Sequence, residues 1–169
     1  LVDVKEKRRA RLTEYAAERA SATYHEGSVW TYDGTFDIAL PCATQNEIDG
    51  EAAKRLVAQG VFCVSEGANM PSNLEAIAVY KEHNLLYGPA KAANAGGVAV
   101  SALEMSQNSL RLSWTREEVD SRLQNIMTNI FNTAKTTAEN YDLGNDYLAG
   151  ANIAAFENIA NAMIAQGIV

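Results

Sequence analysis

Short apolar runs alternate with longer segments of helical spacing along the central part of the chain. Phe36–Leu40, Val61–Ser65 and Leu85–Tyr87 are apolar runs of the length expected for buried strands. The segments between them carry apolar residues three and four positions apart, which is typical of one helix face. Strand, loop and helix follow one another three times, and this order predicts a parallel sheet with helices across its faces.

Cap and turn residues predict where the helices of this region begin and end. Thr44–Glu47 and Ser72–Glu75 have the spacing of a capping box, so a helix is expected to begin at each. Pro41 ends the first strand, and Gly60 ends the first of these helices. The second helix is expected to run through Tyr80.

Both ends of the chain are predicted to be helical. Residues 3–22 have the pattern of one exposed helix, and the basic run within it is expected to be a solvated face. A third capping box, Thr115–Glu118, opens a helix, and residues 150–167 form the last one. The apolar positions of these two helices are Val119, Leu123, Ile126 and Ile130, then Ile153, Phe156, Ile159 and Met163.

Composition and charge narrow the class of partner. The chain has 169 residues, 47% of them hydrophobic, and a formal net charge of −7. This charge argues against nucleic acid or an anionic membrane surface as a partner. No apolar run approaches the roughly 18 residues of a membrane span, and the charged N-terminus has no signal core. Neither Cys42 and Cys63 nor the isolated His25 and His83 have metal-ligand spacing, so no metal site and a cytoplasmic location are expected.

Three segments leave the carboxyl ends of the predicted strands, where parallel sheets bind ligands. They are residues 41–46, "PCATQN", 66–71, "EGANMP", and 89–98, "PAKAANAGGV". Each combines small residues with at least one amide side chain, which offers both hydrogen-bond donors and acceptors. Together they are predicted to form a wall for a ribose and a nicotinamide carboxamide.

The glycine pair Gly96-Gly97 opens a predicted helix, where glycine weakens helical structure. One interpretation is that a ligand lies against the backbone there, with Val98 packing on it and Ser101, on the same helix face, bonding it. The other is tight helix packing, with Ser101 bonding back to the Gly97 carbonyl. The spacing alone leaves both open.

Four motifs make the chain resemble the C-terminal part of the hexameric bacterial glutamate dehydrogenases. They are "DIALPCATQNE", "EGANMP", "KAANAGGVAVSALEMSQN" and "GANIAAF". The "NAGGV" part is shared with leucine and phenylalanine dehydrogenases, whereas "SALEMSQN" and "GANIAAF" point to the glutamate branch. The resemblance implies an α/β fold: the second half of a Rossmann-like parallel sheet with helices on both faces, followed by C-terminal helices.

The resemblance also implies roles for matching positions. Val98 and Ser101 match residues that bind the substrate. The residues that match the cofactor-binding positions are Ala43, Thr44, Gln45, Asn69 and Asn94. The family's catalytic lysines and aspartate lie on a substrate domain that has no match here, so no catalytic residue is expected in this chain. Lys91 is expected to be solvated rather than to replace them.

Residues 1–110 are therefore predicted to be a partial dinucleotide-binding domain, and residues 111–169 to be helices that pack on or beside it. Half a sheet leaves an unpaired strand edge and an exposed apolar face, so we expect a fragment that associates or is unstable when isolated.

The implied function is that of a part of an oxidoreductase using NAD or NADP. It would interconvert L-glutamate with 2-oxoglutarate and ammonia in a homo-oligomer, a hexamer in the family. Two alternatives remain: a dehydrogenase for an apolar amino acid such as leucine or phenylalanine, and a non-catalytic α/β interaction module.

Overall fold

The computed structural model describes residues 1–167, which divide into two compact units, Leu1–Asp33 and a second that begins at Gly34. The division predicted after residue 110 falls inside the second unit and stays a prediction.

The first unit consists of two short helical segments where one helix was expected. The π-helix η1 spans Asp3–Lys7, and the α-helix α1 spans Leu12–Glu18. Between them Arg9 has a φ of 52°, in the left-handed region that a continuing helix cannot use. The prediction of one helix over residues 3–22 is therefore wrong. A short 3₁₀ helix, η2, follows at Val29–Thr31.

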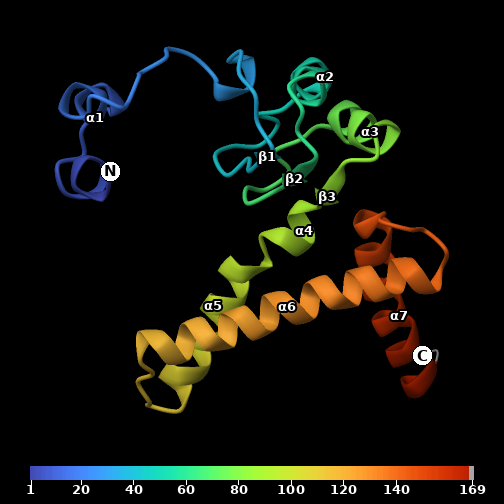
Figure 1. Cartoon of the computed structure of the whole chain (residues 1–169). Helices are drawn as coiled ribbons and strands as arrows, with labels where there is room; N and C mark the ends of the chain where they lie inside the picture. The colour runs from blue at the N-terminus through green and yellow to red at the C-terminus, as the bar shows by residue number, and fades with distance from the viewer. Residues whose placement is uncertain (168–169) are drawn as a thin grey trace. The chain divides into compact units, whose positions relative to one another are not determined.

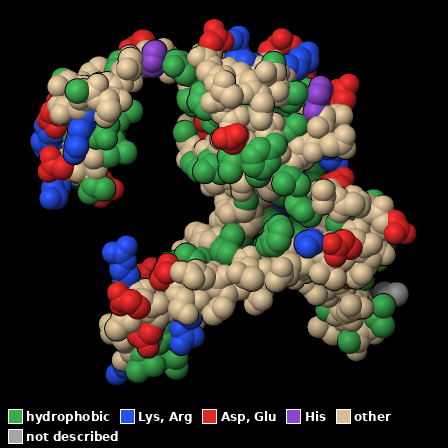
Figure 2. Space-filling view, viewed as in Figure 1, with side chains coloured by type: hydrophobic (Ala, Val, Ile, Leu, Met, Phe, Trp, Pro, Cys, Tyr) green, Lys and Arg blue, Asp and Glu red, His purple; other side chains and the backbone are tan. Residues whose placement is uncertain are grey.

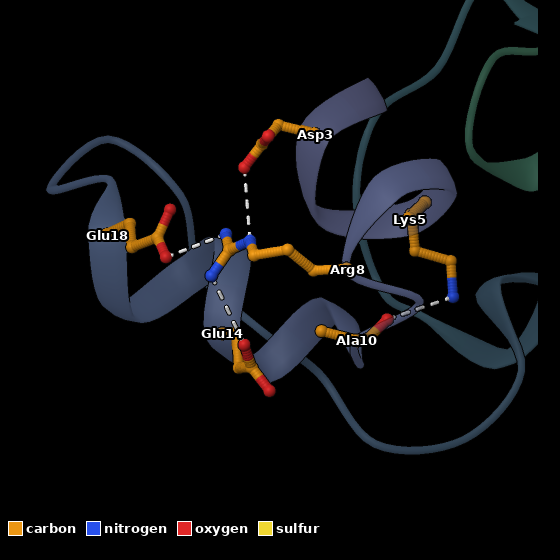
Figure 3. A network of polar contacts seen from close by, with 6 residues as sticks. All are labelled: Asp3, Lys5, Arg8, Ala10, Glu14 and Glu18. Atoms are coloured by element: carbon orange, nitrogen blue, oxygen red, sulfur yellow. Dashed lines mark hydrogen bonds and ion pairs between the residues drawn. The ribbon is translucent and has the colours of Figure 1, made fainter.

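The reversal at Arg9 lets one arginine bridge the two segments (Figure 3). The Arg8 guanidinium lies 3.1 Å from the Asp3 carboxylate of η1. It also lies 3.4 Å from the Glu14 carboxylate and 2.8 Å from that of Glu18, both on α1. Part of the basic run thus holds the segments together, although all these side chains remain partly exposed.

Three short parallel strands form the sheet of the second unit (Figure 1). They are β1, Ile38–Ala39, β2, Cys63–Ser65, and β3, Leu86–Gly88, in the spatial order β1-β2-β3. Each overlaps one of the predicted apolar runs, and β3 extends one residue beyond its run. The prediction of a parallel sheet is confirmed.

Two crossover helices, α2 (Gly50–Ala58) and α3 (Leu74–Glu82), pack against each other beside the sheet (Figure 1). Both connections run the same way along the sheet and parallel crossovers are right-handed, so both helices cover one face. The core there is buried and apolar. It includes Ala53, Leu56, Val64, Ala76, Val79 and Tyr80.

Both of these helices begin later than predicted. Asp49 caps α2, its carboxylate accepting from the Ala52 N–H at 2.8 Å, so the predicted start at Thr44 is wrong. Asn73 caps α3 in the same way, one residue after the predicted cap. The physical reason is an extended pairing between Ile48 and Ser72, which takes up backbone groups that a helix would need.

The chain after β3 is helical but interrupted at Asn94. Helix α4 spans Ala90–Ala93 and α5 spans Ala95–Ser109, so the helix predicted to open at the glycine pair is present as α5. Asn94 is the C-cap residue of α4 and the N-cap residue of α5, with a backbone conformation outside the regular helical region. Its side chain caps neither helix and is available for contacts elsewhere.

The C-terminal part is two long helices, α6 (Arg116–Asn140) and α7 (Tyr147–Gln166), which pack on each other. The capping box of Thr115 and Glu118 is confirmed, with both reciprocal bonds present. Gly150 lies at the α6–α7 crossing, where a Cβ atom would overlap the Ala134 carbonyl.

Helices α6 and α7 approach the second face of the sheet, with a cavity of about 340 Å³ between them and the strands. Cys63 and Leu86 line it from the sheet, and Met127 and Phe131 line it from α6. The predicted fold class, a parallel sheet with helices on both faces, is thus confirmed. The predicted apolar face of α7 is not buried by the described residues, because Phe156, Ile159 and Met163 are all more than half exposed.

Candidate functional site

A cleft of about 540 Å³ lies at the carboxyl ends of the strands, where the sequence placed the ligand site. Residues 42–45, residues 67–69 and the start of α5 all contribute to its walls. The predicted site residues that line it are Ala43, Thr44, Gln45, Asn69, Asn94 and Val98. Ser101 is not among the lining residues.

The two asparagines of the cleft are bonded to each other. The Asn94 Nδ2 donates to the Asn69 Oδ1 at 3.0 Å and to the Ala68 carbonyl at 3.1 Å. The side-chain amide nitrogen of Asn69 and the side-chain amide oxygen of Asn94 form no hydrogen bond with another residue among residues 1–167. The pair therefore offers a ligand one donor group and one acceptor, a combination that complements a carboxamide.

The loop of residues 42–45, which lines the cleft, is stabilised by the carboxylate of Glu47. Its Oε1 accepts the N–H groups of Ala43 at 2.9 Å and of Thr44 at 3.1 Å. The predicted capping-box glutamate thus stabilises a loop instead of opening a helix.

The two loops that line the cleft, residues 42–45 and 67–69, lie close to each other. The N–H groups of Gly67 and Ala68 both donate to the Pro41 carbonyl, at 2.9 and 3.1 Å. A Cβ atom on Gly67 would lie 2.5 Å from the Cys42 Sγ, so glycine permits this approach.

The glycine pair has two different environments. A Cβ atom on Gly96 would lie 3.3 Å from the Leu123 Cδ1 and 3.4 Å from the Met127 Sδ, both on α6. A Cβ atom on Gly97 would meet nothing within 4 Å, and Gly97 lines the cleft. Helix packing thus accounts for Gly96, and the open cleft is next to Gly97.

The two substrate-binding candidates, Val98 and Ser101, also differ in whether they line the cleft. Val98 lines the cleft and is 71% exposed. The exposed Ser101 donates its hydroxyl to the Gly97 carbonyl at 3.3 Å, the contact of the packing interpretation. The substrate-binding roles of both residues stay predictions.

Sequence reasoning missed Glu66, a buried residue only 2% exposed that directly precedes the cleft-lining residues 67–69. Its Oε1 accepts from the Ser72 N–H, and its Oε2 accepts from the Tyr87 hydroxyl and the Ala90 N–H. Burial, together with this hydrogen bond and the Glu66 charge, raises the pKa of Tyr87 well above its usual range. The available signal was a glutamate directly after a buried strand, at the start of "EGANMP".

Lys91 is exposed and lies outside the cleft lining, donating to the Asn152 Oδ1 on α7 at 2.6 Å. No Asp, Glu, His or Lys side chain of residues 1–167 lines the cleft. Its walls are therefore suited to binding and orienting a ligand. In the same part of the chain, no group of three or more acidic, His or Cys side chains is arranged for a metal ion. No helix there has the length and apolarity to cross a membrane.

A parallel sheet whose carboxyl-end loops frame a cleft of small and amide side chains is typical of nucleotide-binding α/β proteins. The chain belongs to the Glutamate/Leucine/Phenylalanine/Valine dehydrogenase family, whose model matches residues 1–167.

Relatives within this family carry glutamate dehydrogenase names. The chain is 50% identical over its whole length to the NADP-specific glutamate dehydrogenase of Giardia intestinalis and covers 38% of that protein. It is also 50% identical to the glutamate dehydrogenase of Bacteroides thetaiotaomicron, again covering 38% of its length. A crystal structure of Plasmodium falciparum glutamate dehydrogenase matches 99% of this chain and 36% of its own, with a TM-score of 0.90 and 45% identity. The resemblance stated from the motifs is confirmed, and the chain spans well under half of these relatives.

Proposed function

We propose that this chain is part of an oxidoreductase that interconverts L-glutamate with 2-oxoglutarate and ammonia, with NAD or NADP as cofactor. The observation that supports this most directly is the cleft with its bonded Asn69–Asn94 pair, in a chain 50% identical to glutamate dehydrogenases. The names of these relatives favour glutamate over an apolar amino acid.

The cleft is suited to the nicotinamide end of such a cofactor. Gly97 leaves open space beside the backbone, and the asparagine pair supplies one donor and one acceptor for a carboxamide or a ribose. When bound, a nicotinamide ring supplies the acceptor or donor of a hydride. Asn69 and Asn94 would orient the ring, while Ala43, Thr44 and Gln45 would form the wall beside it.

Val98 and Ser101 would bind the substrate from one face of α5. Val98 is directed to the cleft, and Ser101 is one turn further along the helix. In this role, the Ser101 hydroxyl would exchange its bond to the Gly97 carbonyl for one to the substrate carboxylate.

The chain itself would carry no acid, base or activating lysine. No Asp, Glu, His or Lys side chain of residues 1–167 lines the cleft, and Lys91 is exposed outside its lining, which supports this assignment. The chain alone would then be inactive. The parent protein would be a cytoplasmic homo-oligomer, a hexamer by the family resemblance, acting without nucleic acid or a membrane.

The test is a binding and activity assay on the full-length protein. Saturable binding of NAD or NADP and a kcat/KM for glutamate that exceeds those for leucine and phenylalanine would support the proposal. A higher kcat/KM for leucine or phenylalanine would favour the alternative of a dehydrogenase for an apolar amino acid. Absence of any saturable dinucleotide signal would favour an interaction module and refute the proposal.

A further inference from the structure

Glu66 is a buried acid whose environment consists of hydrogen-bond donors. Its residue is 2% exposed, and none of the ion pairs among residues 1–167 involves it. Burial of a carboxylate is costly unless its oxygens are bonded. Here the three donors come from three separate segments: Ser72 before α3, Tyr87 in β3 and Ala90 at the start of α4.

One of these bonds closes the loop that carries Asn69. The loop begins at Glu66, whose own N–H donates to the Gly88 carbonyl of β3 at 3.0 Å. It ends at Ser72, whose N–H donates to the Glu66 Oε1 at 3.2 Å. Asn69 lies midway between these two positions. Its backbone is thus held from both sides by a single residue.

A second bond fixes the segment that carries Asn94. The Ala90 N–H, the first of α4, donates to the Glu66 Oε2 at 2.8 Å. Asn94 follows one turn later, at the end of α4. The two oxygens of one carboxylate therefore hold the two segments whose amides are bonded across the cleft.

The third bond provides an internal control. The Tyr87 hydroxyl donates to the Glu66 Oε2 at 2.8 Å, and its ring packs against that of Tyr80. Tyr87 lies in β3, whereas both asparagines lie on segments beyond the strands. Loss of its hydroxyl leaves both backbone bonds of Glu66 in place.

We propose that Glu66 is a positioning residue that sets the Asn69–Asn94 pair in the arrangement that receives the nicotinamide end of the cofactor. This inference rests on the proposed function, because it gives that cleft a dinucleotide ligand. Glu66 touches no ligand itself. It acts through the two backbone segments that it joins.

Glu66→Gln tests the proposal with almost no change in shape. The Ser72 and Ala90 N–H groups donate to different oxygens of the Glu66 carboxylate. A glutamine has only one acceptor oxygen, and an NH₂ group takes the place of the other. Either orientation leaves one backbone N–H facing an NH₂ group. One of the two asparagine segments therefore loses its anchor. Tyr87→Phe is the matched control, since it removes one bond to the same carboxylate and spares both segments.

The experiment measures dissociation constants on the full-length protein, without reliance on turnover. The ligands are the dinucleotide that the wild type binds and the corresponding ADP-ribose fragment, which lacks the nicotinamide ring. We expect Glu66→Gln to weaken dinucleotide binding about tenfold or more, because misplaced asparagine side chains would leave polar groups of the bound ligand unpaired. Binding of the fragment should stay unchanged, and Tyr87→Phe should match the wild type with both ligands.

Equal dinucleotide affinity in Glu66→Gln and Tyr87→Phe would overturn the inference, as would an equal loss for dinucleotide and fragment. A wild-type protein that binds no dinucleotide would refute the proposed function instead, so the two failures are distinguishable. If Glu66→Gln does not fold, Glu66→Asp keeps the charge but withdraws the carboxylate by one methylene, and the same selective loss is expected. Amide hydrogen exchange of Ser72 and Ala90 in the wild type adds a further check: rapid exchange at both would contradict the anchoring.

Discussion

Adjacent residues at the start of α5 have different neighbours. Gly96 faces Leu123 and Met127 of α6, and Gly97 faces the cleft. Only the position of α6, far along the chain, distinguishes the two glycines. The sequence could therefore identify the pair as special but could not assign a separate reason to each residue.

The same substitution at the two glycines should give opposite results. Gly96→Leu places a large side chain against α6 and should destabilise the chain by about 1–3 kcal/mol. Gly97→Leu extends into open space, so it should leave stability almost unchanged and weaken dinucleotide binding by about tenfold, or about 1.4 kcal/mol. Denaturant unfolding of the chain and ligand titration of the full-length protein measure the two effects. Equal effects of both variants on binding would contradict the division of roles.

Ser101→Ala tests the substrate-binding role predicted for this residue. In the full-length protein we expect kcat/KM for glutamate to fall by a factor that corresponds to about 1–3 kcal/mol, the cost of leaving a polar contact unpaired. Ser106→Ala is the matched control, because Ser106 donates to the Ala102 carbonyl in the same way at 2.8 Å and lies on another face of α5. An unchanged kcat/KM in Ser101→Ala would remove Ser101 from the site and leave the packing interpretation.

At the scale of elements, local patterns located the strands and one helix start. The three apolar runs and the Thr115–Glu118 capping box depend on neighbouring residues alone, and the structure confirms them. The predicted start of α2 was wrong because Ile48 pairs with Ser72, which is distant in the sequence and could not be seen in the local pattern. The hydrogen bonds of Glu66 were missed for the same reason, since their donors Ser72, Tyr87 and Ala90 become neighbours only after the sheet forms.

Asp146 both caps α7 and joins it to α3. Its Oδ1 accepts from the Ala149 N–H at 3.0 Å, and its Oδ2 lies 2.8 Å from the Lys81 Nζ. Partial burial opposes ionisation, but the bonds from Lys81 and the backbone outweigh it, so the pKa of Asp146 lies below its ordinary value. A lowered folded-state pKa stabilises the protein above the unfolded-state pKa of about 3.9, and this stabilisation is lost as the pH falls through the folded-state pKa.

Two variants separate the cap of Asp146 from its charge. Asp146→Ala should lower the unfolding free energy by about 1–2 kcal/mol, since it removes both the cap and the ion pair. Asp146→Asn keeps a capping side chain and should cost less than about 1 kcal/mol near neutral pH. The difference between the wild type and Asp146→Asn should shrink as the pH falls from about 5 through the folded-state pKa of Asp146. Denaturant unfolding at each pH measures it. A difference that stays constant over this range would contradict the role of the charge.

For the whole molecule, the exposed apolar surface determines how the isolated chain behaves. Figure 2 shows hydrophobic side chains on the surface around the strands, where Ile38 is 51% and Leu40 is 60% exposed. Among residues 1–167, β1 pairs with a strand on one side only. An uncovered strand edge with apolar side chains favours pairing with another chain.

We therefore expect the isolated 169-residue chain to self-associate with rising concentration, as measured by sedimentation velocity. Leu40→Lys places a charge directly after this edge strand and should shift the population toward the monomer, because a buried lysine would oppose edge pairing. Leu74→Lys is the matched control, since Leu74 is 84% exposed but lies at the start of α3. If both lysines reduced association equally, the effect would not be specific to this strand edge. A chain that stayed monomeric at every concentration would show that this edge does not drive association.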